Sequence, residues 1–150
     1  VMSTLHTNDA VGAVTRLVDI GAERFLIGST LIGVLAQRLT RRLCAHCRKP
    51  RPAMPEELEI LGLEPESTAT LHDPAGCSFC LGSGFRGRIG IFEAFWVDHD
   101  VSTAIAEGAS EGTLHSMARN LRTLWQDACE KVLTGDVALN EVLHLRQEVR

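Results

Sequence analysis

Four of the five cysteines form two Cys-x-x-Cys pairs, and this is the strongest chemical signal in the sequence. The first pair is Cys44 and Cys47, the second is Cys77 and Cys80, and 29 residues separate the two pairs. Each pair can place two sulfur atoms in one tight turn, and two such turns supply the four thiolates that tetrahedral zinc binds at about 2.3 Å. Because four sulfur ligands leave no open position for water, the sequence predicts a structural zinc site and not a catalytic one.

Other chemistries fit the same four cysteines. Iron in a rubredoxin-like site takes the same tetrahedral sulfur ligands, and the pairs could instead be redox-active disulfides or buried thiols. The sequence has no secretory signal, which favours metal over disulfides and indicates a reducing, cytoplasmic compartment. We expect His46, inside the first pair, and His72 to be solvated side chains, because the sulfurs already complete the metal's shell. The fifth cysteine, Cys129, is expected to be a small core residue.

The cysteines lie in a proline-rich region, residues 44–97, which holds all five prolines of the chain. Prolines interrupt regular structure, so we expect only a short helix from Pro55 to Leu61, ended by Gly62, and a strand near Ile89 to Val97. Zinc binding by such turns is worth about 10–16 kcal/mol at neutral pH, against about 5–15 kcal/mol for the stability of a whole domain. The metal is therefore expected to hold this region together.

The preceding region, residues 1–43, is predicted to contain the end of a strand, Val1–Leu5, followed by two helices. Asn8 or Asp9 can cap the first helix, and Gly21 can end it in a left-handed conformation. We expect the second helix to run from about residue 23 to residue 39, with one apolar stripe formed by Leu31, Leu35 and Leu39.

The last region, residues 98–150, is predicted to be helical. Apolar residues recur at helical spacing, with a break near Asn120 and a stop at Gly135. The residues that carry this pattern are Leu114, Ala118, Leu121, Trp125, Ala128, Val132 and Leu133. A last short helix is expected to turn Leu139, Val142 and Leu143 inward.

Charge is segregated along the chain. The stretch from Arg38 to Arg51 holds six basic residues and no acidic residue, which leaves nine basic and nineteen acidic residues elsewhere. The chain as a whole has a formal net charge of −4, which does not favour binding to nucleic acid. The basic run is either a solvated face or a surface for inter-subunit contact or phosphate. No stretch reaches the roughly 18 apolar residues of a transmembrane helix.

Hydroxyl groups and an imidazole gather near the amino terminus, in Ser3-Thr4-Leu5-His6-Thr7-Asn8. The end of a strand before a helix is where open α/β sheets place ligands, and the start of a helix attracts phosphate. By itself this motif is more typical of a cluster of residues that caps the helix than of a ligand site.

Together, five motifs resemble the secretion motor ATPases, which comprise the GspE-type ATPases of type II secretion and the related pilus-assembly ATPases. The motifs occur in the family's order and span nearly the whole chain, and residues 12–17 look more like the secretion branch than the pilus branch. They are residues 3–8, Gly12-Ala13-Val14-Thr15-Arg16-Leu17, Leu35-Ala36-Gln37-Arg38-Leu39, the four cysteines, and Gly87-Arg88-Ile89-Gly90-Ile91-Phe92-Glu93.

The resemblance implies an α/β parent with a RecA-like P-loop core that forms a homo-hexamer at the cytoplasmic face of a bacterial inner membrane. There it would hydrolyse ATP with magnesium and act on inner-membrane platform proteins to assemble a pseudopilus. Residues 3–8 match the family's His box, so His6 would be the catalytic or phosphate-sensing residue, with Thr4 and Thr7 beside it. The cysteines match the family's zinc-binding subdomain, and Arg38 would lie near a subunit boundary.

Three domains follow from this interpretation. Residues 1–43 would be the carboxy-terminal part of the nucleotide-binding core, residues 44–97 the zinc-binding subdomain with a strand, and residues 98–150 a helical subdomain. The chain is thus expected to be mostly α-helical, with a short β element, and to be a piece of a longer protein. A P-loop needs Gly-x-x-x-x-Gly-Lys-Ser/Thr, and neither lysine, Lys49 or Lys131, stands in that context. We expect no ATP hydrolysis by this chain alone.

Two other classes of protein fit the sequence. A stand-alone zinc-ribbon module could use the Arg38–Arg51 run to bind nucleic acid, although the run lacks the aromatic residues that commonly stack on bases. A thiol redox protein would lose free thiols reversibly on oxidation, without releasing metal.

Overall fold

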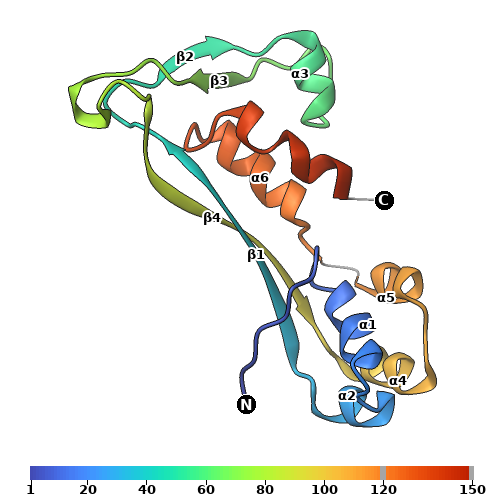
Figure 1. Cartoon of the computed structure of the whole chain (residues 1–150). Helices are drawn as coiled ribbons and strands as arrows, with labels where there is room; N and C mark the ends of the chain where they lie inside the picture. The colour runs from blue at the N-terminus through green and yellow to red at the C-terminus, as the bar shows by residue number, and fades with distance from the viewer. Residues whose placement is uncertain (119–120, 149–150) are drawn as a thin grey trace. The chain divides into compact units, whose positions relative to one another are not determined.

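Two long strands, β1 (Gly33–Leu43) and β4 (Phe85–Trp96), pair with each other in a computed structural model of the chain (Figure 1). The structure describes residues 1–118 and 121–148. Its contacts divide the chain into two units, and each unit is assembled from two separated stretches. Unit 1 comprises residues 1–37 and 92–124, and unit 2 comprises residues 38–91 and 125–150.

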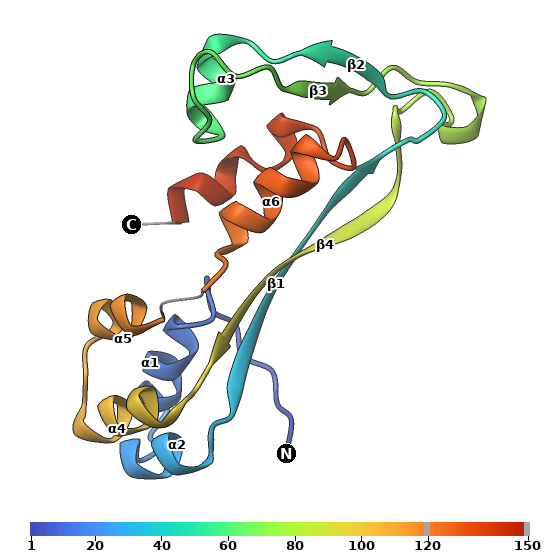
Figure 2. The ribbon, with the colours of Figure 1, turned by 180° about the vertical axis from the view of Figure 1, so that it is seen from behind.

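Unit 1 is a cluster of helices around one end of the two strands. Its helices are α1 (Gly12–Asp19), α2 (Arg24–Thr30), α4 (His99–Glu107) and α5 (Glu111–Met117). Figure 2 shows these four helices lying together beside the final part of β4 and the first part of β1. Their apolar faces share one core, formed by Ala10, Val11, Val14, Ile27, Ala36, Phe95, Val101, Ile105 and Leu114.

The ends of these helices follow the local chemistry of the sequence. The Asp9 carboxylate accepts a hydrogen bond from the amide of Gly12 at 2.6 Å, as a helix start requires. Gly21 has a φ of 97°, which confirms that it ends α1 in a left-handed conformation. The carboxylate of Asp98 caps α4 by accepting from the amide of Val101 at 2.9 Å.

The predicted helix over residues 23–39 is wrong in its second half. Helix α2 stops at Thr30, and residues from Gly33 onward form β1. Burial in this strand alternates, so that Ala36 is buried whereas Leu35 and Leu39 are 63% and 54% exposed. The leucine spacing indicated a helix, but pairing with the distant strand β4 decides the conformation, as tertiary context often does.

The strand end predicted at Val1–Leu5 is also absent from the described part of the chain. Residues 1–7 have no regular secondary structure, and residues 1–6 are exposed. A strand persists only where a neighbour takes up its backbone hydrogen bonds. The two described sheets, β1 with β4 and β2 with β3, contain no partner for this segment.

Unit 2 contains a small antiparallel sheet of β2 (Lys49–Pro52) and β3 (Thr70–Asp73), joined by the short helix α3 (Pro55–Ile60). The predicted helix from Pro55 is confirmed, and Gly62 follows it with a φ of 71°. Most of α6 (Leu124–Leu133) also belongs to this unit, with the 3-10 turns η1 (Ser78–Cys80), η2 (Leu139–Glu141) and η3 (Leu143–Glu148).

The carboxy-terminal helical pattern is confirmed in outline. The chain forms α4, α5 and α6, and Gly135 follows α6 with a φ of 77°. The predicted break near Asn120 lies outside the described residues. The last predicted helix consists of two 3-10 segments, in which Leu139 and Leu145 are buried.

The chain is a mixed helix and sheet structure whose β component is longer than predicted. Strands β1 and β4 have 11 and 12 residues. The two compact units do not coincide with the three consecutive regions read from composition, because each unit combines early and late parts of the chain. Among the described residues, no helix is long and apolar enough to cross a membrane.

We predict that Gly28→Ala destabilises unit 1. A Cβ at residue 28 would lie 2.6 Å from the backbone oxygen of Ser102, where α2 packs on α4, and such overpacking costs about 1–3 kcal/mol. Gly112→Ala is the matched control, because a Cβ there has no atom nearer than the Ser110 Oγ at 4.0 Å. Denaturant unfolding should show a loss for the first variant and an unchanged or higher stability for the second. Equal effects of both would contradict this packing.

Candidate metal centre

The four cysteine sulfurs of the two pairs converge in unit 2. The distance from Sγ to Sγ is 3.9 Å between Cys44 and Cys77, and 3.7 Å between Cys47 and Cys80 and between Cys77 and Cys80. All four ligand atoms lie within 4.8 Å of one another. In a regular tetrahedron with metal–sulfur bonds of about 2.3 Å, the sulfurs are about 3.8 Å apart. The observed spacing therefore fits a tetrahedral thiolate site.

Backbone hydrogen bonds shape each pair into a tight turn. In the first, the amides of Cys47 and Arg48 donate to the carbonyl oxygen of Cys44 at 3.1 and 2.9 Å. In the second, the amide of Gly82 donates to the carbonyl oxygen of Cys77 at 2.9 Å. The amide of Cys44 also donates to the carbonyl of Gly84 at 2.9 Å, which ties the two turns together.

The thiols are placed in different electrostatic environments. Burial opposes ionisation of Cys80, but its Sγ accepts from the amides of Cys77 and Gly84 at 3.1 and 3.2 Å, and these donors lower the pKa of the thiol to about 6. At Cys47, burial raises the pKa. Because metals bind the thiolate, these amide donors favour the form of Cys80 that could act as a ligand.

His46 and His72, which we expected not to bind the metal, do not join the four sulfurs. The exposed ring of His46 stacks on Phe79 with ring centroids 4.1 Å apart and an interplanar angle of 10°. Each ring comes from the interior of one cysteine pair, so the stack is a second link between the two turns. The prediction of a solvated His72 is wrong, because its ring lies against Gly135 and its Nδ1 is buried, without a hydrogen-bond partner among the described residues. Burial, and then the charge of Arg48, lowers the pKa of His72.

The fifth cysteine lies apart from this cluster. Cys129 is half-buried on α6, and burial raises the pKa of its thiol to about 11. Its sulfur is not one of the four that converge. All five cysteines are free thiols in the structure.

A second group of potential ligands, formed by Asp9, Glu111 and His115, lies in unit 1. These side chains are half-buried or exposed, and the two carboxylates already accept from the amide of Gly12 and the hydroxyl of Thr15. We assign no metal to them.

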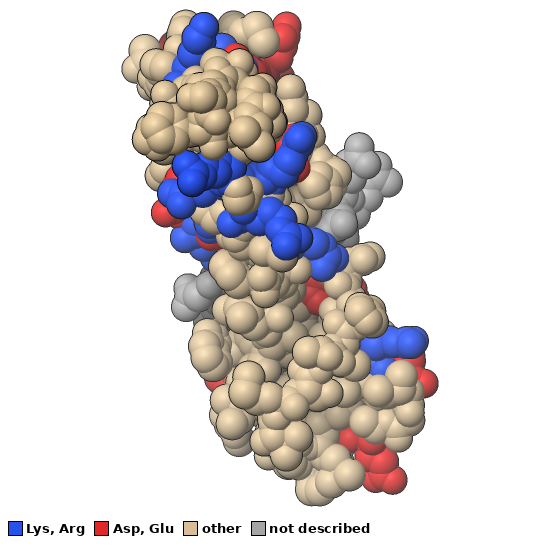
Figure 3. Space-filling view, turned by 60° about the vertical axis from the view of Figure 1, so that its left-hand side comes forward, with Lys and Arg blue, Asp and Glu red and all other residues tan. Residues whose placement is uncertain are grey.

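The basic run is largely neutralised by acids from elsewhere in unit 2. Arg41 makes a two-pronged pair with Glu141 at 2.8 and 2.6 Å, and Arg42 binds Asp136 at 3.1 and 2.7 Å. Arg48 donates to the carbonyl oxygen of Gly135. Figure 3 shows basic side chains gathered on one face, with acidic side chains beside several of them. The acidic partners lie 94 and 100 residues away, so no local sequence pattern marks them.

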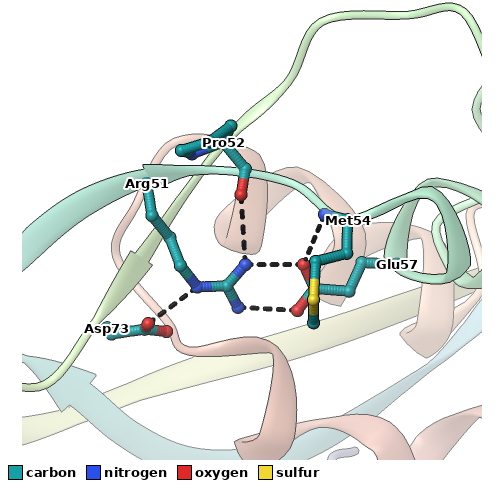
Figure 4. Close-up of polar contacts among 5 residues, drawn as sticks. All are labelled: Arg51, Pro52, Met54, Glu57 and Asp73. Carbon is teal, nitrogen blue, oxygen red and sulfur yellow. Dashed lines mark hydrogen bonds and ion pairs between the residues drawn. The ribbon is translucent and has the colours of Figure 1, made fainter.

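Arg51 is the centre of the best-connected polar network in the proline-rich region (Figure 4). Its guanidinium binds both carboxylate oxygens of Glu57 at 2.6 Å and Asp73 at 2.7 Å. Glu57 is only 8% exposed and also accepts from the amide of Met54 at 2.8 Å, at the start of α3. This network joins β2, β3 and α3, and it raises the pKa of Arg51 and lowers that of Glu57.

The residues assigned to nucleotide chemistry lie in both units. Thr4 and His6 are in the exposed amino-terminal segment of unit 1. Thr7 is half-buried, and its hydroxyl donates to the carbonyl of Asp9 at 3.0 Å. Arg38 is half-buried in β1 and belongs to unit 2. Their predicted roles stay predictions.

Comparison with known proteins gives the family. The profile described as "Type II/IV secretion system protein" matches residues 1–144. The chain belongs to this family. The relatives of this secretion family include "Type II secretion system protein E" of Pectobacterium carotovorum, 44% identical, and "Type II secretion system ATPase E" of Vibrio cholerae, 42% identical, each over 99% of this chain. The resemblance to GspE-type proteins is therefore confirmed.

The chain spans 30% of the length of these two relatives. A further relative, "Type IV pilus assembly ATPase PilB" of Thermus thermophilus, is 44% identical over 95% of this chain, which is 16% of its own length. By identity, the pilus relative is therefore as similar to the chain as these two secretion relatives.

We predict that Arg51→Gln destabilises unit 2 by about 1–3 kcal/mol, the usual range for hydrogen bonds to charged groups. The substitution removes the donors that hold Glu57 and Asp73. Lys49→Gln, on the exposed end of the same strand, is the control and should change stability by less than about 0.5 kcal/mol. Denaturant unfolding of the metal-loaded proteins measures both, and a loss shared by the control would count against the network.

The effect of Arg51→Gln should depend on pH. Because Arg51 lowers the pKa of Glu57, the stability from this pair is fully present above the ordinary glutamate pKa of about 4.3 and is lost as pH falls through the lowered value. The stability difference between wild type and variant should be constant from pH 7 to pH 5 and shrink below that. Metal content is measured on both proteins at each pH so that release of metal is accounted for, and a pH-independent difference would contradict the assignment.

Proposed function

We propose that this chain is the zinc-bearing carboxy-terminal portion of the motor ATPase that powers type II protein secretion. The observation that carries the proposal is 44% identity to a type II secretion protein E over 99% of the chain. The convergence of the four cysteines adds independent support for the zinc-binding part.

Zinc supplies structural cross-linking here, because four thiolates complete its tetrahedral shell and leave no position for a reacting water. Cys44 and Cys47 hold it from the end of β1, while Cys77 and Cys80 hold it from the turn before β4. The amide donors to Cys80 favour the thiolate that binding requires. The chain contributes a rigid lobe to the motor and no metal-centred chemistry.

The nucleotide-related roles belong to the same proposal. His6 acts on the nucleotide phosphates, with Thr4 and Thr7 beside it, and Arg38 lies near a subunit boundary. ATP and magnesium bind in a RecA-like core that includes a P-loop, which this chain does not contain. The complete protein works as a homo-hexamer at the cytoplasmic face of a bacterial inner membrane, on the platform proteins that assemble the pseudopilus.

The pilus-assembly branch is the second candidate, since a pilus ATPase is also 44% identical to the chain. The nucleic-acid-binding zinc ribbon is disfavoured, because Arg41, Arg42 and Arg51 are already paired with carboxylates. A thiol redox function is disfavoured as well, because a redox disulfide needs only one pair of sulfurs, whereas all four sulfurs here lie within 4.8 Å of one another, as a single metal ion requires.

The zinc proposal predicts one zinc ion per chain, lost in Cys44→Ser and retained in Cys129→Ser. The control removes a half-buried thiol that lies outside the cluster. Metal analysis with a free-thiol count measures both variants. Cobalt substitution should give the intense absorption of a tetrathiolate site in wild type and in Cys129→Ser, but not in Cys44→Ser. Zinc content unchanged by Cys44→Ser, or iron in place of zinc, would contradict the assignment.

The motor proposal predicts that this chain alone does not hydrolyse ATP, whereas the complete protein that carries it does. Activity of the complete protein should fall at least tenfold in His6→Ala and should be unchanged in Thr68→Ala, which alters an exposed side chain two residues before β3. A phosphate-release assay measures all of them. ATP turnover by the 150-residue chain, or full activity of His6→Ala, would overturn the assignment.

A further inference from the structure

Glu93 is a buried carboxylate that the proposed metal site does not use. It is 4% exposed and lies on β4, two residues after Ile91, where the chain passes from unit 2 into unit 1. Charged side chains are rarely buried to this extent unless hydrogen bonds compensate for lost hydration. The partners of Glu93 therefore show what its burial accomplishes.

Both carboxylate oxygens bind backbone amides from distant segments. Oε1 accepts from the amide of Ala10 at 2.8 Å, and Oε2 accepts from the amide of Leu124 at 3.1 Å. The donors are 83 and 31 residues away in the sequence, and both hydrogen bonds are buried. Since an ionised carboxylate only accepts, one side chain satisfies two amides that have no intrahelical partner.

The first amide belongs to a turn that directly follows the Ser3–Asn8 segment. Ala10 and Val11 are fully buried, and hydrogen bonds run from the Thr7 hydroxyl to the carbonyl of Asp9 and from the amide of Gly12 to the Asp9 carboxylate. The backbone from Thr7 to Gly12 is thus held against the core, and Glu93 is the residue of β4 that binds it. The exposed His6 is one residue from this anchored stretch.

The second amide belongs to the last residue of unit 1 before the chain enters unit 2. Leu124 is 4% exposed and is also the first residue of α6. The chain crosses between the units three times, after Gln37, Ile91 and Leu124. Glu93 lies beside the second crossing, and its hydrogen bond to Leu124 links it to the third. The hydrogen bond thus ties the last residue of this stretch of unit 1 to β4.

We propose that Glu93 is a positioning residue that links the turn after His6 to the first residue of α6. We call its two hydrogen bonds, from the amides of Ala10 and Leu124, the clasp. Because Ala10 follows the Ser3–Asn8 segment, the clasp makes the position of this segment depend on the position of Leu124, the last residue before the chain enters unit 2. Its consequence for ATP hydrolysis rests on the proposed function of His6, whereas the clasp itself does not. An apolar residue of the same size cannot serve, because both amides would lose their acceptor in a buried environment.

Hydrogen exchange measured by NMR on the 150-residue chain tests the clasp. Glu93→Gln keeps the shape but offers one oxygen and one NH2 group, so at least one of the amides of Ala10 and Leu124 should exchange ten or more times faster. Glu93→Leu should release both. Val101→Ala, which trims a 2% exposed core residue of the same unit outside the clasp, controls for general destabilisation and should accelerate amides throughout unit 1.

Steady-state kinetics of the complete protein tests the consequence. Glu93→Gln should lower kcat at least tenfold with less than a threefold change in the KM for ATP, because misplacing a reacting group costs rate more than binding. Val101→Ala should leave both constants within twofold. Denaturant unfolding measures how far each variant is destabilised, and where the two losses are equal a purely structural role of Glu93 predicts the same kinetic constants for both variants.

Each result decides one claim. Amides of Ala10 and Leu124 that exchange in Glu93→Gln no faster than in Val101→Ala would overturn the clasp, whatever the activity. Released amides with an unchanged kcat would overturn the positioning role. If the wild-type complete protein does not hydrolyse ATP, the proposed function fails, and the exchange measurement still decides whether Glu93 holds the two segments together.

Discussion

The pairing of β1 with β4 is the constraint on which the candidate metal centre depends. Cys44 follows the last residue of β1 directly, and the second cysteine pair lies just before the first residue of β4. The amide of Cys44 continues the contact by donating to the carbonyl of Gly84. The two cysteine pairs therefore meet because the strands do. A metal held by the four sulfurs would close the excursion between the pairs, residues 48–76, into a loop and so lower the entropy cost of ordering it.

Within the excursion, charged hydrogen bonds do much of what a hydrophobic core does elsewhere. Leu58, Leu61 and Leu71 are its buried leucines. Arg51 adds a planar guanidinium that engages two carboxylates at once, a geometry that lysine does not offer. The arginines that looked in the sequence like a free basic surface are therefore structural members of unit 2, and this weakens the argument for a polyanionic partner.

Local chemistry was readable from the sequence, and long-range pairing was not. The end of α1 at Gly21 and the start of α3 at Pro55 each depend on residues within a few positions, and the structure confirms them. The spacing within each cysteine pair is equally local, and the structure brings the four sulfurs together as a metal site would require. Residues 33–39 were misread as helix because their strand partner lies about fifty residues later. The same limit hid Glu93, whose burial is explained only by amides far along the chain.

The interleaving of the two units has a consequence for how the chain acquires its structure during synthesis. Unit 1 cannot be completed before residue 124 has been made, and unit 2 needs residues beyond 125. Both cysteine pairs are available by residue 80, earlier than either unit can close. Since domains form as their residues emerge from the ribosome, both cysteine pairs are made before β4, and they can meet only after the strand that pairs with β1 has followed them.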